Sequence, residues 1–127
     1  MSDDVGVQVD KVNVVPNSVH VRVAHDLLLA GHRYLDVRTP EEFNRGHPIG
    51  AVNIPYMYKT SAGMTKNPDF VKDVKSIFGE DTELIVGCQM GKRSQMAATH
   101  LSSSGFTAIT DNTGGYSAWM ENGFPTQ

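Results

Sequence analysis

The sequence predicts an α/β fold, with a central parallel sheet of five strands and helices on both faces. Short apolar runs alternate with amphipathic segments along most of the 127 residues, as in chains of βαβ units. The run Leu84–Val86 shows no polar alternation, which is typical of a strand buried on both faces. No internal repeat or low-complexity tract interrupts the pattern. A chain of this length suits one domain with one core.

The first half of the chain carries three of the predicted strands. Val19–Val23 alternates apolar and polar residues and is expected to lie near a sheet edge. The helix-favouring segment Ala24–Ala30 then leads to a second strand, Tyr34–Val37, which completes one βαβ unit. Thr39–Phe43 places threonine at the N-cap and proline at the first helical position, and therefore predicts a short helix. Ala51–Ile54 is the third predicted strand.

The second half carries the remaining elements. Residues 56–66 form a connection that is either an ordinary surface loop or a lid. A helix then begins at Asn67-Pro-Asp and ends at Gly79, since apolar residues recur at helical spacing. Leu84–Val86 is the next strand, Ala108–Thr110 the last one, and Tyr116–Asn122 the last helix. Trp119 is expected to pack at that end of the domain.

The first 18 residues differ from the rest in composition. They contain three aspartates and a single lysine, with no long apolar run. Such a segment is expected to be a flexible lead-in to a domain spanning residues 19–127. Because it resembles neither a secretory signal nor a basic transit peptide, the cytoplasm is the expected location. A plastid remains the alternative if the chain is made with a transit peptide that this sequence lacks.

Composition argues against several classes of function. The net charge is −3, and no basic cluster exceeds two residues, so no nucleic-acid surface is expected. No apolar run approaches the roughly 20 residues of a membrane span. One cysteine cannot form an internal disulfide. The five histidines show no metal-ligand spacing, so neither a metal nor another cofactor is expected.

The single cysteine stands where a reactive thiol is expected. Cys88 opens a loop of six residues that ends at Arg93 and joins a buried strand to a helix, for which Ser94 is the predicted N-cap. Helix N-termini stabilise anions, and Lys92 and Arg93 add positive charge. Gly91 can adopt a positive φ and turn backbone amides inward. The sequence therefore predicts a thiolate at the bottom of a cup of amides.

The size of this cup favours a small anion. Four residues separate Cys88 from Arg93, whereas the loop of cysteine-dependent phosphatases has five and surrounds a tetrahedral phosphoryl group. The shorter loop is better matched to a single sulfur atom carried on the cysteine as a persulfide.

Three stretches of the chain resemble one known family. Cys88–Arg93 resembles the active-site loop of rhodanese-type sulfurtransferases. Tyr34–Phe43, followed by Gly50–Pro55, is similar to the N-terminal rhodanese signature, and Gly114–Trp119 is similar to the C-terminal one. The three occur in the family's order. The chain is most similar to the small single-domain plant members, the senescence-associated and dark-inducible rhodanese-type proteins.

The resemblance implies a rhodanese fold and a sulfurtransferase activity without cofactor. Cys88 would be the nucleophile that takes a sulfane sulfur from thiosulfate or a mercapto-acid. The outer sulfur would then pass to cyanide or a low-molecular-weight thiol, with thioredoxin and glutathione as candidate thiols. No second cysteine is present to resolve the intermediate, so an external nucleophile is required.

The residues of the loop have different expected roles. The candidate anion-binding residues are Gln89, Met90, Gly91, Lys92, Arg93 and Ser94. Many family members carry basic residues where this chain has Gln89 and Met90, which weakens the case for a dianionic donor. Arg93 either binds substrate or holds loop carbonyls or a carboxylate such as Asp36. Asp36 and Arg38 follow the same side of a neighbouring strand and are expected near Cys88, where Arg38 could supply charge.

Two other classes of function stay open. An arsenate reductase or a phosphatase on the same fold would also use a cysteine in an anion-binding loop. A non-catalytic rhodanese-like module would bind a partner instead, although such modules often lack the cysteine. His47, between a glycine and a proline, is interpreted as a turn or packing residue.

Overall fold

The computed structural model describes residues 16–127, and the lead-in predicted before residue 16 lies outside the described residues. In chain order the elements are β1 (Asn17–Val19), α2 (Val21–Leu29), β2 (Arg33–Asp36), α3 (Pro40–Asn44), β3 (Val52–Asn53), β4 (Met57–Thr60), β5 (Gly63–Lys66), α4 (Phe70–Ile77), β6 (Leu84–Gly87), α5 (Lys92–Ser103), β7 (Ile109–Asn112) and α6 (Gly115–Glu121).

The predicted five-stranded parallel sheet is confirmed. Its strand order is β1-β7-β6-β2-β3, and each neighbouring pair is parallel. β6 is therefore the central strand, with β2 and β7 on either side. Because ligands collect beyond the carboxyl ends of parallel strands, the residues after β2, β6 and β7 share one functional edge.

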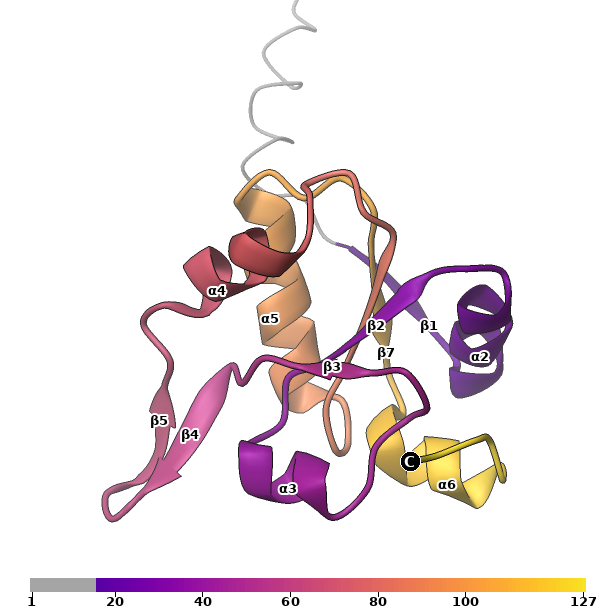
Figure 1. Ribbon diagram of the computed structural model, residues 1–127, viewed down its shortest axis with the longest axis horizontal. Helices are drawn as coiled ribbons and strands as arrows, with labels where there is room; N and C mark the ends of the chain where they lie inside the picture. The colour runs from indigo at the N-terminus through magenta and orange to yellow at the C-terminus, as the bar shows by residue number, and fades with distance from the viewer. Residues whose placement is uncertain (1–15) are drawn as a thin grey trace, which may run out of the picture.

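Helices cover both faces of this sheet (Figure 1). α4 and α5 pack on one face and α2 and α6 on the other, as the two clusters of buried side chains show. The pleat of β2 and β6 divides their side chains between these clusters: Leu35, Leu84 and Val86 join the first, whereas Tyr34 and Ile85 join the second. β6 is thus buried on both faces, as its apolar run predicted.

The first strand is shorter than predicted, and the extension of this strand to Val23 is wrong. β1 ends at Val19, and α2 begins at Val21. The His20 side chain caps this helix by accepting a hydrogen bond from the backbone N–H of Arg22. β1 also starts before the predicted domain boundary, because Asn17 pairs with β7. The predicted edge position is confirmed, since β1 pairs only with β7 among the described strands.

Residues 56–66 form a β-hairpin. β4 and β5 pair in antiparallel fashion, with Lys59 opposite Met64, and the hairpin extends away from the main sheet (Figure 1). The sequence predicted a loop or a lid and did not indicate these strands. Among the described residues, the longest helix has 12 residues, and no helix combines the length and apolarity that a membrane span requires.

Candidate active site

Cys88 lies directly after the central strand, at the functional edge of the sheet. Its sulfur accepts a hydrogen bond from the backbone N–H of Gly91, with a distance of 3.0 Å between Sγ and N. The side chain is 2% exposed. Of the predicted cup of amides, the Gly91 N–H is the donor that the structure places at the sulfur.

Gly91 allows the loop to close around the sulfur. Its φ is 114°, and a Cβ atom at this position would collide with the carbonyl oxygen of Thr113. Gly91 is also the N-cap of α5, which begins at Lys92, so the prediction that Ser94 is the N-cap is wrong. Ser94 lies in the first turn instead, and its hydroxyl donates to Asp111 Oδ1 at 2.7 Å. The left-handed conformation of Gly91 starts the helix earlier than the serine indicated.

The loop is anchored on its other side by the start of α6. The backbone N–H groups of Tyr116 and Ser117 donate to the carbonyl oxygens of Cys88 and Gln89, at 2.8 and 3.0 Å. Gly115 permits this contact, because its φ is 63° and a Cβ atom would lie only 2.6 Å from each of the two oxygens. The glycine pair before the last helix therefore serves to dock the active-site loop.

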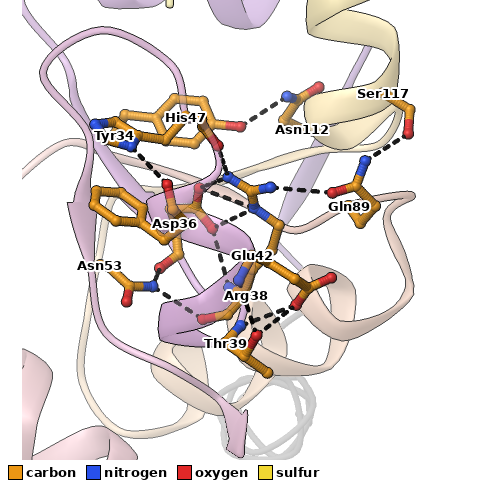
Figure 2. A network of polar contacts seen from close by, with 12 residues as sticks. Tyr34, Asp36, Arg38, Thr39, Glu42, His47, Asn53, Gln89, Asn112 and Ser117 are labelled. Carbon is orange, nitrogen blue, oxygen red and sulfur yellow. Dashed lines mark hydrogen bonds and ion pairs between the residues drawn. The ribbon is translucent and has the colours of Figure 1, made fainter. Parts of the chain in front are cut away.

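Asp36 and Arg38 form a buried ion pair beside the loop (Figure 2). Arg38 Nη2 lies 2.8 Å from Asp36 Oδ2, and Nη1 donates to Gln89 Oε1 at 3.0 Å. The guanidinium also lies over the Tyr116 ring. Arg38 therefore reaches the loop as predicted, but it positions Gln89 while its charge is paired with Asp36.

Gln89 is a bridging residue. Its side-chain amide accepts from Arg38 through Oε1 and donates to Ser117 Oγ through Nε2 at 3.0 Å (Figure 2). Met90, by contrast, is 74% exposed, and Lys92 is exposed as well. These two side chains lie at the rim of the site.

Glu42, which the sequence analysis did not single out, holds the end of the loop. Arg93 Nη1 and Nη2 donate to the two Glu42 oxygens at 2.7 and 3.0 Å. The suggestion that Arg93 pairs with Asp36 is wrong, because Arg38 already occupies that carboxylate. Glu42 also completes a capping box with Thr39. The Thr-x-x-Glu spacing was visible in the sequence, but the partner 51 residues away was not.

The ion pair shifts the pKa of both partners away from the protonation changes of neutral solution. Burial of the Glu42 carboxyl opposes its ionisation, yet the hydrogen bonds from Arg93 and Thr39 outweigh burial and hold the pKa at about 2. The same hydrogen bond raises the pKa of Arg93. The pair is therefore charged throughout the physiological range.

Asp111 lies behind the loop and was also missed. It is buried at the end of β7 and accepts hydrogen bonds from Ser94 and Ser18. Burial raises the pKa of its carboxyl, and the two hydroxyl donors only partly oppose this. No local pattern distinguished this aspartate, since its burial depends on how α5 packs over β7.

Within residues 16–127, no cluster of three or more His, Cys, Asp or Glu side chains could hold a metal ion. His47 stacks on Phe43 with a ring separation of 3.6 Å, and its Nδ1 lies 2.9 Å from the Phe43 carbonyl oxygen. The interpretation of His47 as a packing residue is confirmed.

Two hollows lie on either side of α3. The hairpin hollow, of about 470 Å³, lies between α3 and the β4–β5 hairpin and is lined by Thr39, Glu41, Glu42, Arg45, Lys59 and Met64. The α6 hollow, of about 400 Å³, lies between α3 and α6 and is lined by Arg38, Glu42, Arg45, Gln89, Tyr116 and Met120. Glu42 and Arg45 contribute to both.

A rhodanese-like domain model matches residues 20–122. The chain belongs to the rhodanese-like family. This rhodanese domain is 62% identical to thiosulfate sulfurtransferase 16, chloroplastic, of Arabidopsis thaliana, over 89% of this chain and 94% of that protein. It is 36% identical to the thiosulfate:glutathione sulfurtransferase of Homo sapiens, over 75% of this chain and 85% of that protein. The resemblance to plant members is thereby confirmed.

Solved structures agree with the fold. The rhodanese-like domain of an Anabaena protein, solved by NMR, superposes with a TM-score of 0.72 at 26% identity, and the match covers 87% of this chain and 77% of that one. The rhodanese fold expected from the sequence is confirmed.

Proposed function

We propose that the protein is a sulfurtransferase that carries a sulfane sulfur as a persulfide on Cys88. The observation that supports this most is the 3.0 Å hydrogen bond from the Gly91 amide to the Cys88 sulfur. The names of the two sulfurtransferase relatives agree with the proposal.

The reaction has two steps. The Cys88 thiolate attacks the outer sulfur of thiosulfate, the bond between the two thiosulfate sulfurs breaks, and sulfite leaves with the electron pair. The persulfide anion then gives its outer sulfur to cyanide, which forms thiocyanate, or to a thiolate, which becomes a persulfide. Each transfer to the acceptor regenerates the Cys88 thiolate, so no external oxidant or reductant is needed.

The loop backbone, through the Gly91 N–H, is the main source of anion stabilisation in this proposal. Arg38 is paired with Asp36 and Arg93 with Glu42, so neither guanidinium brings an unpaired charge to the sulfur. Backbone N–H donors held in place before the reaction stabilise developing charge without reorganising. A persulfide anion carries one negative charge and suits such a site.

The test measures the intact mass of the protein after incubation with thiosulfate. A nucleophilic thiol should gain one sulfur atom, roughly 32 Da, and lose it to cyanide as thiocyanate. Cys88→Ser should show neither the adduct nor turnover. Glu121→Gln, which changes an exposed carboxylate on α6, serves as the control and should behave as the unmodified protein.

The outcomes separate the alternatives. Appreciable transfer by Cys88→Ser would refute the role of the thiol. Absence of an adduct with both thiosulfate and a mercapto-acid would refute the sulfurtransferase, and turnover of arsenate or an aryl phosphate would then identify the other enzyme classes. An unreactive thiol with no turnover would indicate a binding module.

Two indications of the protein's location in the cell disagree. The composition of the first residues favours the cytoplasm, whereas the Arabidopsis relative is named chloroplastic. We propose the cytoplasm as the location. Imaging of a C-terminal fluorescent fusion in leaf cells would show cytoplasmic signal, and signal confined to plastids would contradict the proposal.

A further inference from the structure

Asp111 is a buried carboxylate without a cationic partner. Its side chain is 2% exposed, and none of the ion pairs among residues 16–127 includes it. Its hydrogen-bond donors are two hydroxyl groups, that of Ser94 at 2.7 Å and that of Ser18 at 3.4 Å. A buried carboxylate that no cation neutralises lowers the stability of a fold. Costs of this kind are concentrated at functional sites.

The carboxylate reaches the active-site loop through Ser94. This serine is fully buried in the first turn of α5. Its Oγ lies 2.7 Å from Asp111 Oδ1 and 3.1 Å from the carbonyl oxygen of Gly91, so its single proton is within reach of both oxygens. The closer acceptor is the carboxylate, which forms the stronger hydrogen bond. Ser94 therefore ties Gly91 to the end of β7.

Gly91 in turn carries the donor that faces the reacting sulfur. Its N–H lies 3.0 Å from Cys88 Sγ, and its Cα packs against the carbonyl oxygen of Thr113, which follows β7. A hollow of about 360 Å³ borders both Gly91 and Asp111, so side chains do not pack against the loop throughout this side. The position of the N–H therefore depends on a small number of polar contacts.

From these contacts we infer that Asp111 is a positioning residue for sulfur transfer: through Ser94 it holds Gly91 so that the Gly91 N–H faces the Cys88 sulfur. A donor held in place before the reaction stabilises developing charge without reorganising, and a small displacement of such a donor slows the reaction. The inference rests on the proposed function and adds a residue to its machinery.

The first test measures how fast iodoacetamide alkylates Cys88 at neutral pH, a reaction that needs the thiolate but no sulfur donor. Ser94→Ala and Asp111→Leu should each slow alkylation about two- to tenfold, the effect of losing one hydrogen bond. Asp111→Asn keeps an acceptor for Ser94 and should restore a rate close to that of the unmodified protein. The matched control is Thr99→Val, which removes a hydroxyl that donates to a backbone carbonyl further along α5 and should change nothing.

The second test separates positioning from donor binding. In a single turnover with thiosulfate, Ser94→Ala and Asp111→Leu should lower the rate of persulfide formation at saturating donor and leave the KM for thiosulfate unchanged, because the structure places neither side chain at the donor. The double variant Ser94→Ala/Asp111→Leu should be no slower than Ser94→Ala, since both changes break one chain of contacts. Urea unfolding of each variant shows whether a loss of rate merely follows a loss of stability.

Three results would overturn the inference. They are an alkylation rate that is unchanged or faster in Ser94→Ala, losses that add in the double variant, and an Asp111→Asn variant as slow as Asp111→Leu. Ser94→Ala removes only a hydroxyl and decides the question if Asp111→Leu fails to fold. If Cys88 is alkylated but no donor forms a persulfide, the proposed function fails, and the alkylation rates still decide whether Asp111 positions the loop.

Discussion

The ion pair between Glu42 and Arg93 is expected to stabilise the fold, and Glu42→Gln isolates its charge. Glutamine keeps the side-chain oxygen that completes the capping box with Thr39, so the main loss is the charge that faces Arg93. The pKa of Glu42 is lowered from 4.5 to about 2, which corresponds to at most about 3 kcal/mol. The Arg93 and Glu42 side chains are 17% and 22% exposed, so solvent screening reduces the expected loss to about 1–2 kcal/mol.

The stabilisation that Glu42 contributes depends on pH, and the direction of its pKa shift predicts how. A carboxyl whose pKa is lower in the folded state stabilises the fold above its unfolded pKa, and this stabilisation is lost as the pH falls. The unmodified protein should therefore lose the contribution of Glu42 between about pH 5 and pH 2. Glu42→Gln should be less stable at pH 7 and should approach the unmodified protein at the acid end.

Urea unfolding at several pH values measures this difference. Trp119, the single tryptophan, is fully buried, so its fluorescence reports unfolding of the core. Glu121→Gln removes an exposed carboxylate on α6 and should leave the curve unchanged at every pH. The reasoning is refuted if Glu42→Gln is as stable as the unmodified protein at pH 7, or if their difference persists at pH 2.

Two further substitutions test the surroundings of the loop. Asp111→Asn should stabilise the protein by about 0.5–1 kcal/mol at pH 7, because a buried carboxylate is replaced by a neutral group that still accepts from Ser94. Since burial raises the pKa of Asp111, the gain should shrink as the pH falls and Asp111 becomes protonated, and a loss of stability at pH 7 would contradict the argument. Met90→Lys places a positive charge at the rim and should lower the KM for thiosulfate about two- to fivefold at low salt, while urea unfolding stays unchanged. An unaltered KM would show that the rim does not contribute to donor binding.

Elements with strong local signals were predictable from the sequence. The apolar run of β6, the cap at Thr39 and the spacing of Phe70 and Val74 in α4 each depend on neighbours within a few residues. The prediction of the first strand was wrong because the apolar residues of Val19–Val23 fit both the two-residue period of a strand and the spacing of a helix. Its alternation matches a strand, but Val21 and Ala24 also lie one helical turn apart, and both are buried. The helix forms because it buries Val21 and Ala24 against α6 and β6.

The site was predictable where its parts are adjacent in the chain. Cys88 and Gly91 are separated by two residues, so the sequence alone indicated a sulfur facing an amide. The choice of Glu42 as the partner of Arg93 could not be derived in this way. It depends on α3 lying beside the start of α5 and on Arg38 already occupying Asp36.

These two ion pairs explain how the loop keeps its shape without free guanidinium groups at the sulfur. Arg38, which is paired with Asp36, donates a hydrogen bond to Gln89, the second residue of the loop. Glu42 is paired with Arg93, the last residue of the loop. Each arginine is paired within the protein, so both ends of the loop are braced from opposite sides. The amide of Gly91 then faces the sulfur before any substrate arrives. Because each arginine is neutralised by its carboxylate partner, the Gly91 N–H is the donor that faces the sulfur, and neither guanidinium adds an unpaired charge there.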